Sequence, residues 1–279
     1  MDKLLKVALI QASARPDMQE NLEFIDQNIE RAVKLGVKFV LTPENSCHML
    51  YPQTAKLEIA VSEDAHPFLK HFLKRAQELD IWLLLGSITI KDGDGKLLNR
   101  SFLISPQGEI AARYDKIHLF DVDTPDGVSY RESQTFNGGD KAVMAQSEIG
   151  NIGLTICYDV RFPHLYRDLA QLGADIITVP AAFTVPTGRA HWEVLLRARA
   201  IENGVFILAP AQTGTHQGDR TTWGHSLIIN PWGEVLADGG NEPGMIIAEI
   251  DLSEVTKRRG QIPSLKNGRP YSVFEAPKT

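Results

Sequence analysis

A helical pattern, a glycine and then an apolar strand recur along the chain, and this order restricts the fold more than any other sequence feature. Apolar side chains repeat at helical spacing from Leu22 to Val33, and VKFVLTPE follows Gly36. The order returns at Gly173 (LGADIITVP) and Gly204 (NGVFILAP). Because glycine accepts the left-handed conformation that ends a helix, each segment is predicted to pass from helix to strand. This alternation predicts an α/β fold with helices packed outside a sheet.

Other parts of the sheet are predicted to be antiparallel. Residues 81–90 (IWLLLGSITI) and 96–105 (KLLNRSFLIS) flank DGDG, and Asp-Gly supplies the positive φ angles of a tight hairpin turn. Residues 101–110 (SFLISPQGEI) also resemble residues 226–235 (SLIINPWGEV). Two interpretations stay open: an internal repeat that sets one sheet against another, or a chance match, since Pro-x-Gly-Glu is a common turn composition.

Length and composition predict an ordinary globular protein. The 279 residues are 43% hydrophobic and 23% charged, without a long apolar span, so we expect one domain over residues 1–279 and no membrane segment. The formal charge of −6, without a cluster of Lys and Arg, argues against a nucleic-acid partner. The opening MDKLLKVALIQASARPD does not resemble a secretory signal, so a cytoplasmic location is expected. Residues 260–279, with three prolines, are predicted to form an extended C-terminal arm.

Cysteine is rare in the chain. Cys47 and Cys157 are the only two, and no CxxC or HExxH pattern occurs, so neither a disulfide framework nor a zinc site is predicted. Cys157 ends the apolar run IGLTIC and is followed by YDVRFP. Local sequence favours a buried packing thiol here, while a nucleophile at the mouth of a pocket is the other interpretation.

Charged or nucleophilic residues stand at or near three predicted strand ends. Glu44 follows FVLTP, Lys116 lies in AARYDKIHLF, and Cys157 follows IGLTI. Functional side chains tend to gather past the ends of strands in such sheets. Taken singly, Glu44 could cap the next segment, Lys116 could be a solvated charge and Cys157 could be core.

Taken together, these residues are suited to hydrolysis. Lys116 would favour the thiolate of Cys157, and Glu44 would serve as general base, first for the thiol and later for water. Lys116 and the backbone N–H of Tyr158 would stabilise the oxyanion of the tetrahedral intermediate.

FVLTPEN, YDKIHLF and LTICYDVRFP resemble, in order and spacing, the three signature blocks of the nitrilase superfamily of carbon–nitrogen hydrolases. This resemblance spans nearly the whole chain. It implies a Glu44-Lys116-Cys157 triad, a four-layer α-β-β-α sandwich, no metal or organic cofactor, and assembly as a homodimer or higher homo-oligomer. It also implies that Glu132, in SYRESQTFNGGD, is a second glutamate beside the lysine.

Residues 182–214 and 223–235 are most similar to the Nit group of amidases, some of which hydrolyse deaminated glutathione. The expected reaction is hydrolysis of a primary amide through a Cys157 thioester, with release of ammonia. The alternatives are an ω-amidase acting on α-ketoglutaramate, an N-carbamoyl amino acid amidohydrolase, and an inactive scaffold of the same fold.

A small anionic amide substrate would need positive or donor groups beside the triad. Arg161 is a candidate clamp for a carboxylate, with a salt bridge to Asp159 as the equally favoured alternative. Arg220 is a second candidate, and Phe183 with Thr184 could form a wall of the pocket. Tyr158 completes the predicted substrate-binding set.

Overall fold

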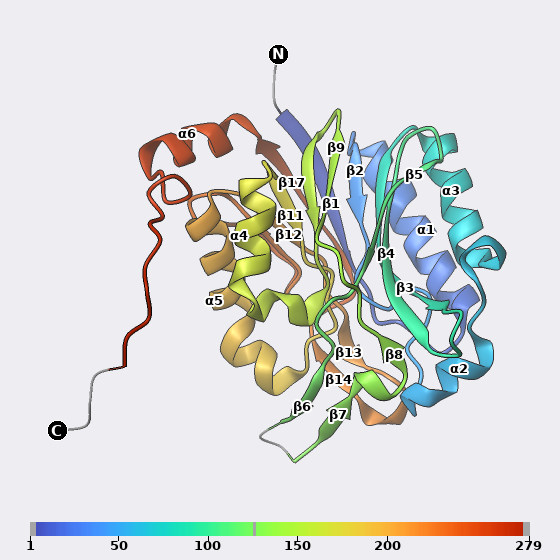
Figure 1. The fold of residues 1–279 in the computed structure, drawn as a ribbon. Coiled ribbons are helices and arrows are strands. Elements are labelled where there is room, and N and C mark those ends of the chain that lie inside the picture. Colours follow the sequence, from blue (N-terminus) through green and yellow to red (C-terminus); the bar gives the residue numbers. More distant parts are fainter. Residues whose placement is uncertain (1–3, 125–126, 276–279) are drawn as a thin grey trace.

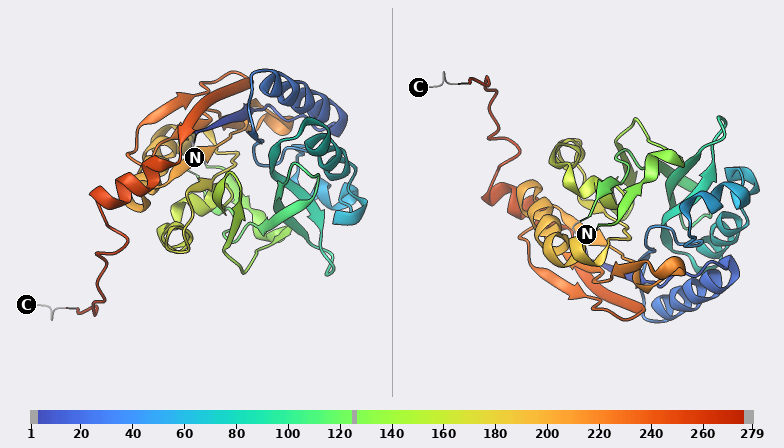
Figure 2. Two further views of the ribbon diagram at one scale, coloured as in Figure 1. Left: turned by 90° about the horizontal axis from the view of Figure 1, so that it is seen from above. Right: turned by 90° about the horizontal axis from the view of Figure 1, so that it is seen from below.

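The protein is a four-layer sandwich with two mixed sheets at its centre. The computed structural model describes residues 4–124 and 127–275. Helices α1 (Met18–Lys34) and α3 (Pro67–Leu79) cover one sheet, and α4 (Pro163–Gln171) and α5 (Val185–Asn203) cover the other (Figure 1). The views from above and from below in Figure 2 show the helices outside and the two sheets between them. The predicted α-β-β-α architecture is confirmed.

The first sheet has the order β17-β1-β2-β3-β4-β5, and β8 pairs with β4. Its central pairs β1·β2 and β2·β3 are parallel, while β17·β1, β3·β4 and β4·β5 are antiparallel. The predicted hairpin over β3 and β4 is therefore confirmed. The strands are β1 (Leu4–Gln11), β2 (Phe39–Leu41), β3 (Trp82–Lys91), β4 (Leu97–Ile104), β5 (Ile110–Asp115), β8 (Phe136–Asn137) and β17 (Gly244–Asp251).

The second sheet repeats this plan. Its order is β16-β15-β12-β11-β10-β9, with parallel pairs β10·β11 and β11·β12 and antiparallel pairs elsewhere. The two matching sequence segments form the β4·β5 and β15·β16 hairpins, and each hairpin has a register shift at the same place. The match is therefore an internal repeat. The strands are β9 (Val143–Ser147), β10 (Gly150–Leu154), β11 (Ile176–Thr178), β12 (Phe206–Ala209), β15 (Leu227–Ile229) and β16 (Val235–Asp238).

Each half of the chain sends a strand to the other half's sheet. Strand β9 comes after the strands of the first sheet but pairs with β10 in the second. Strand β17 comes after the strands of the second sheet but pairs with β1 along all eight of its residues, from Gly244 to Asp251. The two sheets are therefore linked by a reciprocal exchange of strands.

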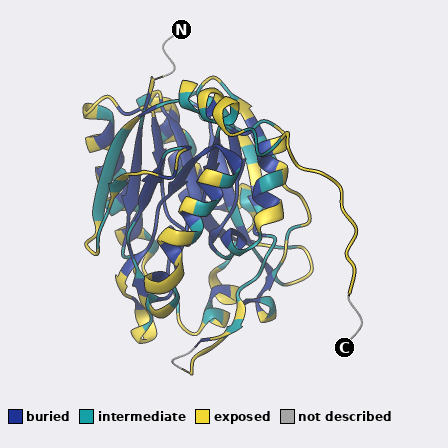
Figure 3. Ribbon diagram, turned by 90° about the vertical axis from the view of Figure 1, so that its left-hand side faces the viewer, coloured by how far each residue is buried: buried dark blue, intermediate teal, exposed yellow. Residues whose placement is uncertain are grey.

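Side-chain alternation along β1 explains the layers. Val7 and Leu9 point into the core between the sheets, while Ala8 and Ile10 pack with the residues of α1 and α3. Successive side chains of a strand face opposite sides, so one apolar strand serves two cores. The dark strands in Figure 3 show this burial.

The predicted helix stops are confirmed. Gly204 caps α5 with φ +58°, and Gly36 and Gly173 follow α1 and α4 with φ +80° and +105°. These are left-handed conformations that glycine adopts without the steric cost of a side chain.

Shorter elements surround one end of the sheets. They are α2 (Lys56–Ile59), the ribbons β6 (Asp121–Asp123) with β7 (Ser129–Arg131) and β13 (Thr213–Thr215) with β14 (Thr221–Trp223), and the 3-10 helices η1 (Gln53–Ala55), η2 (Glu63–Ala65), η3 (Glu132–Gln134), η4 (Cys157–Arg161) and η5 (Gln217–Asp219). These elements surround the strand ends at which the predicted catalytic residues lie.

The chain ends with α6 (Ser253–Gln261) and an irregular segment. Residues 266–275 are exposed, and Figure 3 shows this segment leaving the body of the protein. The last residues of the predicted arm, 276–279, lie outside the described residues. Within residues 4–124 and 127–275, no helix is long and apolar enough to cross a membrane.

Candidate active site

Residues far apart in sequence meet at one pocket between the two sheets. Glu44 follows β2, Lys116 follows β5, Glu132 begins η3 and Cys157 begins η4 after β10. All four line a pocket that encloses about 470 Å³, its open mouth included. The structure therefore brings together every residue predicted to be catalytic.

Gly86 allows the strand ends to approach this closely. A Cβ at Gly86 would lie 1.9 Å from the Thr42 carbonyl oxygen and 2.5 Å from the Pro180 Cβ. Thr42 lies two residues before Glu44, and the Pro180 carbonyl accepts a bond of 2.9 Å from the Cys157 N–H. A side chain at Gly86 would thus separate the segments that carry the base and the thiol.

Cys157 stands at a sharp junction between strand and helix. Its φ is +49°, which is uncommon for a residue with a side chain. The first bond within η4 joins Asp159 N to Ile156 O at 3.1 Å. The N–H of Tyr158, one residue earlier, therefore has no partner inside the helix and can serve an oxyanion.

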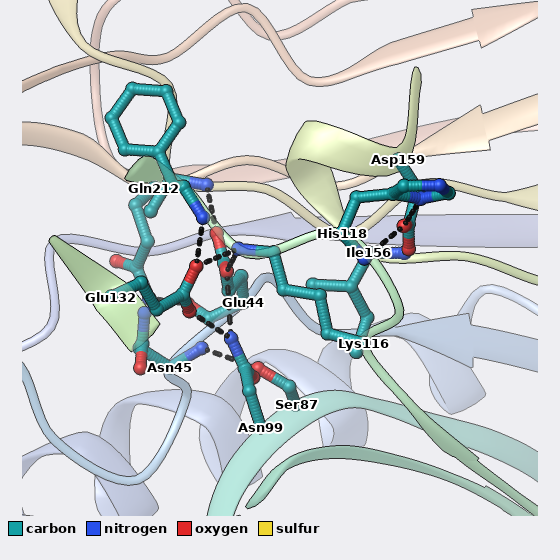
Figure 4. Close-up of polar contacts among 12 residues, drawn as sticks. Glu44, Asn45, Ser87, Asn99, Lys116, His118, Glu132, Ile156, Asp159 and Gln212 are labelled. Atoms are coloured by element: carbon teal, nitrogen blue, oxygen red, sulfur yellow. Dashed lines mark hydrogen bonds and ion pairs between the residues drawn. The ribbon is translucent and has the colours of Figure 1, made fainter. Parts of the chain in front are cut away.

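Glu44, Lys116 and Glu132 form a buried charge cluster (Figure 4), and Glu44 also contacts the Cys157 thiol. Lys116 Nζ is 3.0 Å from Glu44 Oε1 and 2.8 Å from Glu132 Oε2. Asn99 Nδ2 donates to Glu44 Oε1 at 2.9 Å and to Glu132 Oε1 at 3.2 Å. The N–H of Ala182 donates to Glu44 Oε2 at 2.9 Å. Each carboxylate is thus held by charge-assisted bonds in a fixed orientation.

The pKa directions follow from this geometry. Burial raises the pKa of Glu44, but the charge of Lys116 and the bonds from Lys116, Cys157 and Asn99 outweigh it, so the net pKa is lowered. Burial lowers the pKa of Lys116, but Glu132 and Glu44 raise it more strongly, to well above 10.5. At neutral pH the site therefore contains the carboxylate of Glu44 and the ammonium of Lys116.

The pKa of the Cys157 thiol is raised overall, although Lys116 lowers it as predicted. Burial, and then the charge of Glu44, raise the pKa of Cys157 well above 9.0, and Lys116 does not compensate. One ammonium beside two carboxylates leaves the cluster negative, so a thiolate would add a second negative charge. Lys116 therefore acts in the predicted direction but does not outweigh burial and Glu44, and the thiol must lose its proton as it attacks.

A second buried network ties the lysine segment to the cysteine segment. Asp159 accepts bonds from the Tyr114 hydroxyl at 2.7 Å, the Ile156 N–H at 2.9 Å and the His118 N–H at 3.1 Å. His118 Nδ1 also lies 2.6 Å from this carboxylate. Because Tyr114 and His118 flank Lys116, one carboxylate fixes the lysine relative to the thiol.

The predicted substrate-binding residues separate into two groups. Tyr158, Phe183, Thr184 and Arg220 line the pocket, whereas Arg161 is not among its lining residues. The Arg161 guanidinium lies 5.8 Å from the Tyr158 ring centroid and 5.4 Å from that of Phe183. It also lies 3.3 Å from His191 Nδ1.

The alternative for Arg161 was a salt bridge to Asp159. Asp159 instead pairs with His118, so that alternative is wrong. Arg161 supports the aromatic wall of the pocket through cation–π contacts.

Sequence reasoning missed several residues of the site. Asn99 joins both glutamates, and the pocket is further lined by Asn45, Gln53, Phe120, Tyr130 and Thr187. Alternation along LLNRSFLI puts Asn99 on the same face as Leu97 and Ser101, and all three are buried. A polar amide on the buried face of a strand was the signal that could have found it.

Comparison with known proteins shows the family of the chain. The carbon–nitrogen hydrolase family model matches residues 6–259. Deaminated glutathione amidase of Synechocystis is 46% identical over 93% of this chain and 96% of its own length. The NitFhit protein of C. elegans is 36% identical with a TM-score of 0.90, covering 95% of this chain, which spans 65% of the NitFhit chain.

A third similar protein is an amidase from Nesterenkonia sp. AN1, solved as a mutant with acrylamide added to its active site cysteine. It is 27% identical with a TM-score of 0.78 and covers 93% of this chain and 95% of its own. Taken with the whole-length family match, these likenesses establish that the chain belongs to the carbon–nitrogen hydrolase family of the nitrilase superfamily.

Proposed function

We propose that this carbon–nitrogen hydrolase is an amidase that cleaves deaminated glutathione through a thioester on Cys157. The buried contact of Glu44 with Lys116, beside the thiol, is the observation that carries the chemistry. The substrate is suggested by the Synechocystis relative, whose name is deaminated glutathione amidase.

In the first half of the proposed reaction, Glu44 removes the proton of the Cys157 thiol as the sulfur attacks the amide carbon. The raised pKa of the thiol makes this proton transfer part of the attack rather than a separate step. Lys116 and the Tyr158 N–H stabilise the oxyanion. Glu44 then gives its proton to the departing amine, and the C–N bond breaks to leave the thioester.

In the second half, Glu44 takes a proton from water, which attacks the thioester carbon. The C–S bond breaks, the thiolate recovers a proton and the carboxylic acid leaves. Glu132 acts through Lys116 and Asn99, which it contacts at 2.8 and 3.2 Å, and holds both in place during the charge changes. Amide and water are thereby converted to acid and amine.

This substrate determines the leaving group. Glutathione is γ-glutamyl-cysteinyl-glycine, and its deaminated form has a keto group in place of the glutamyl amine. Both of its amides are secondary, so the expected primary amide and ammonia are replaced here by a secondary amide and an amine. An ω-amidase would instead release ammonia from α-ketoglutaramate, which gives a direct way to separate the two functions.

The test measures both products on purified full-length protein. Deaminated glutathione has no primary amine, so an amine-reactive fluorophore detects its cleavage, while a coupled assay detects ammonia from α-ketoglutaramate. We expect faster turnover of deaminated glutathione, and loss of both activities in Cys157→Ala. Cys47→Ala is the matched control, because Cys47 is also a buried free cysteine.

Faster turnover of α-ketoglutaramate would assign the ω-amidase function instead, and N-carbamoyl amino acids form a third substrate arm. Full activity in Cys157→Ala would refute the thioester. A folded protein inactive on all three substrates would point to the scaffold alternative.

We further propose that residues 1–279 form one domain, and that the protein is a homodimer or higher homo-oligomer. The arm predicted over residues 260–279 would then begin after α6, which ends at Gln261. Exposed apolar side chains support an interface: Val194, Ile201, Trp232, Ile262, Tyr271, Val273 and Phe274. These lie on α5, the β15·β16 turn and the C-terminal segment. A sizing-column mass of one chain would contradict the dimer. The cytoplasmic location stays a prediction.

A further inference from the structure

A buried lysine lies behind the catalytic pocket and takes no part in the mechanism. Lys56, the first residue of α2, is only 2% exposed. Its ammonium donates to Asn45 Oδ1 and lies 5.6 Å from the Phe136 ring centroid. Among the described residues it forms no ion pair with Asp or Glu. A buried ammonium without a carboxylate is costly, so its presence requires an explanation.

Arg220 is a second cation in the same situation. It lines the catalytic pocket, and its guanidinium contacts the Ala182 carbonyl at 3.4 Å, Met49 Sδ at 3.8 Å and the Tyr130 ring at 5.7 Å. Its Nε is buried and has no hydrogen-bond partner. Within the described ranges, neither Arg220 nor Lys56 has an acidic partner, so this end of the pocket is positive.

Lys56 also determines which way the Asn45 amide points. A lysine can only donate, so the atom facing it must be the Asn45 carbonyl oxygen, which leaves the amide nitrogen at the other end. Asn45 lines the pocket, and its backbone N–H is fixed by Ser87 Oγ at 3.0 Å. In the described part of the chain, no acceptor bonds to this amide nitrogen.

Both donors lie close to the reacting atoms. Asn45 directly follows Glu44. Ala182 donates its N–H to Glu44 at 2.9 Å and offers its carbonyl to Arg220 at 3.4 Å, so a single residue separates the guanidinium from the general base. An acyl group held at Cys157 would therefore reach these donors with its far end after a few carbon atoms.

We propose that Arg220 and the amide of Asn45, oriented by Lys56, form a subsite for the terminal carboxylate of the acyl group. The ligand class is a short dicarboxylic acid, of which one carboxyl is the amide to be cleaved. Arg220 determines specificity by direct contact, and Lys56 is a positioning residue. This inference rests on the proposed amidase function but concerns the acyl side, which deaminated glutathione shares with α-ketoglutaramate.

The subsite should respond to pH through Lys56. Burial lowers the pKa of Lys56 to about 8, and the charged or titratable groups around it are Cys47, Arg220, Glu44, Glu132 and His48. The pKa of Cys47 is raised, that of Glu44 is lowered and that of His48 is about 3. None of these three side chains therefore changes its protonation near pH 8. Lys56 is charged below its pKa, so carboxylate binding should weaken as the pH rises from 7 to 9.

The test uses Cys157→Ala protein and calorimetric titration with 2-oxoglutarate, the acyl product, so that no turnover is needed. We expect measurable binding that weakens about 30-fold in Arg220→Gln, as for loss of a charge-assisted contact. Lys56→Met should weaken binding about 5-fold to 10-fold and abolish its change between pH 7 and 9. Arg197→Gln, which alters an exposed arginine of α5, is the matched control and should bind normally.

The outcomes separate the two proposals. No binding to Cys157→Ala, or equal binding in Arg220→Gln and the control, would overturn the subsite. Binding that keeps its pH dependence in Lys56→Met would remove the positioning role of Lys56. Carboxylate binding without cleavage of deaminated glutathione would refute the proposed substrate and leave the subsite standing.

Discussion

Two groups of buried charges meet at one pocket, and they differ in how they are compensated. Lys116 has two carboxylates within 3.0 Å, and Asn99 joins those carboxylates to each other. Lys56 has a neutral amide, and Arg220 has a carbonyl, a sulfur and a ring. The first group is complete without a ligand, whereas the second has donors without an acidic partner among the described residues.

This difference separates chemistry from recognition. A compensated cluster keeps its geometry while protons move, which a catalytic base requires. An uncompensated cluster lowers the free energy of unfolding of the free protein. Binding of an anion offsets that loss. Changes to the first group should therefore reduce kcat, and changes to the second should mainly weaken binding.

The largest effect is expected for Glu44→Gln, which keeps the shape of the base and removes its charge. Turnover should fall by about 100-fold to 10,000-fold because no general base remains. The same change should lower the pKa of the Cys157 thiol, since Glu44 raises it. The measurement is the pH dependence of Cys157 alkylation in a Cys47→Ala background. A midpoint that stays in place or rises would contradict the charge assignment of the cluster.

The next effect is expected for Lys116→Met. It leaves two buried carboxylates facing each other, so the free energy of unfolding should fall by about 3 to 5 kcal/mol. Loss of an oxyanion donor should lower kcat by about 100-fold to 1000-fold. Chemical denaturation and steady-state kinetics report the two separately. Lys116→Arg, which keeps the charge, should recover part of the stability, and equal instability in both variants would indicate lost packing instead.

The smallest effect, and one of opposite sign, is expected for Lys56→Met. The pKa of Lys56 is about 8 in the folded protein against an ordinary 10.5, so burial of its charge destabilises the fold fully below pH 8 and not at all above pH 10.5. After loss of the Asn45 bond is subtracted, the variant should be about 1 to 2 kcal/mol more stable at pH 7.

Denaturation of Lys56→Met at pH 7 and pH 10 tests this, with the exposed lysine variant Lys74→Met as control. The gain should shrink at the higher pH. A lower stability of Lys56→Met at pH 7 would mean that Lys56 stabilises the fold instead of preparing the site for a ligand. The Lys56–Arg220 group would then not differ from the Lys116 cluster in the way described.

Much of the fold followed from local rules in the sequence. Glycine at the helix ends, alternation in the strands and the Asp-Gly turn are short-range signals, and each led to an element that the structure contains. The strand ends carrying Glu44, Lys116 and Cys157 were also placed correctly at one pocket. Their meeting could be anticipated because all three follow strands of a sandwich.

The residues that were missed depend on contacts between distant segments. Asn99 reaches Lys116 through the antiparallel pairing of β4 with β5, in which Arg100 pairs with Asp115. Lys56 lies in the polar stretch YPQTAKLEIA, where a lysine ordinarily faces solvent. The raised pKa of Cys157 depends on its burial and on the charges of Glu44 and Lys116, which no single motif contains.

The pairing of β17 with β1 has a consequence for how this enzyme can be divided. Glu44 and Lys116 belong to the first repeat and Cys157 to the second, so a chain cut in the exposed segment before β9 would give two pieces without a complete site. The second piece would carry β17, whose eight-residue pairing with β1 gives it a template for rejoining the first. Hydrolysis would then return only on reassembly, which makes the protein a natural candidate for a split reporter.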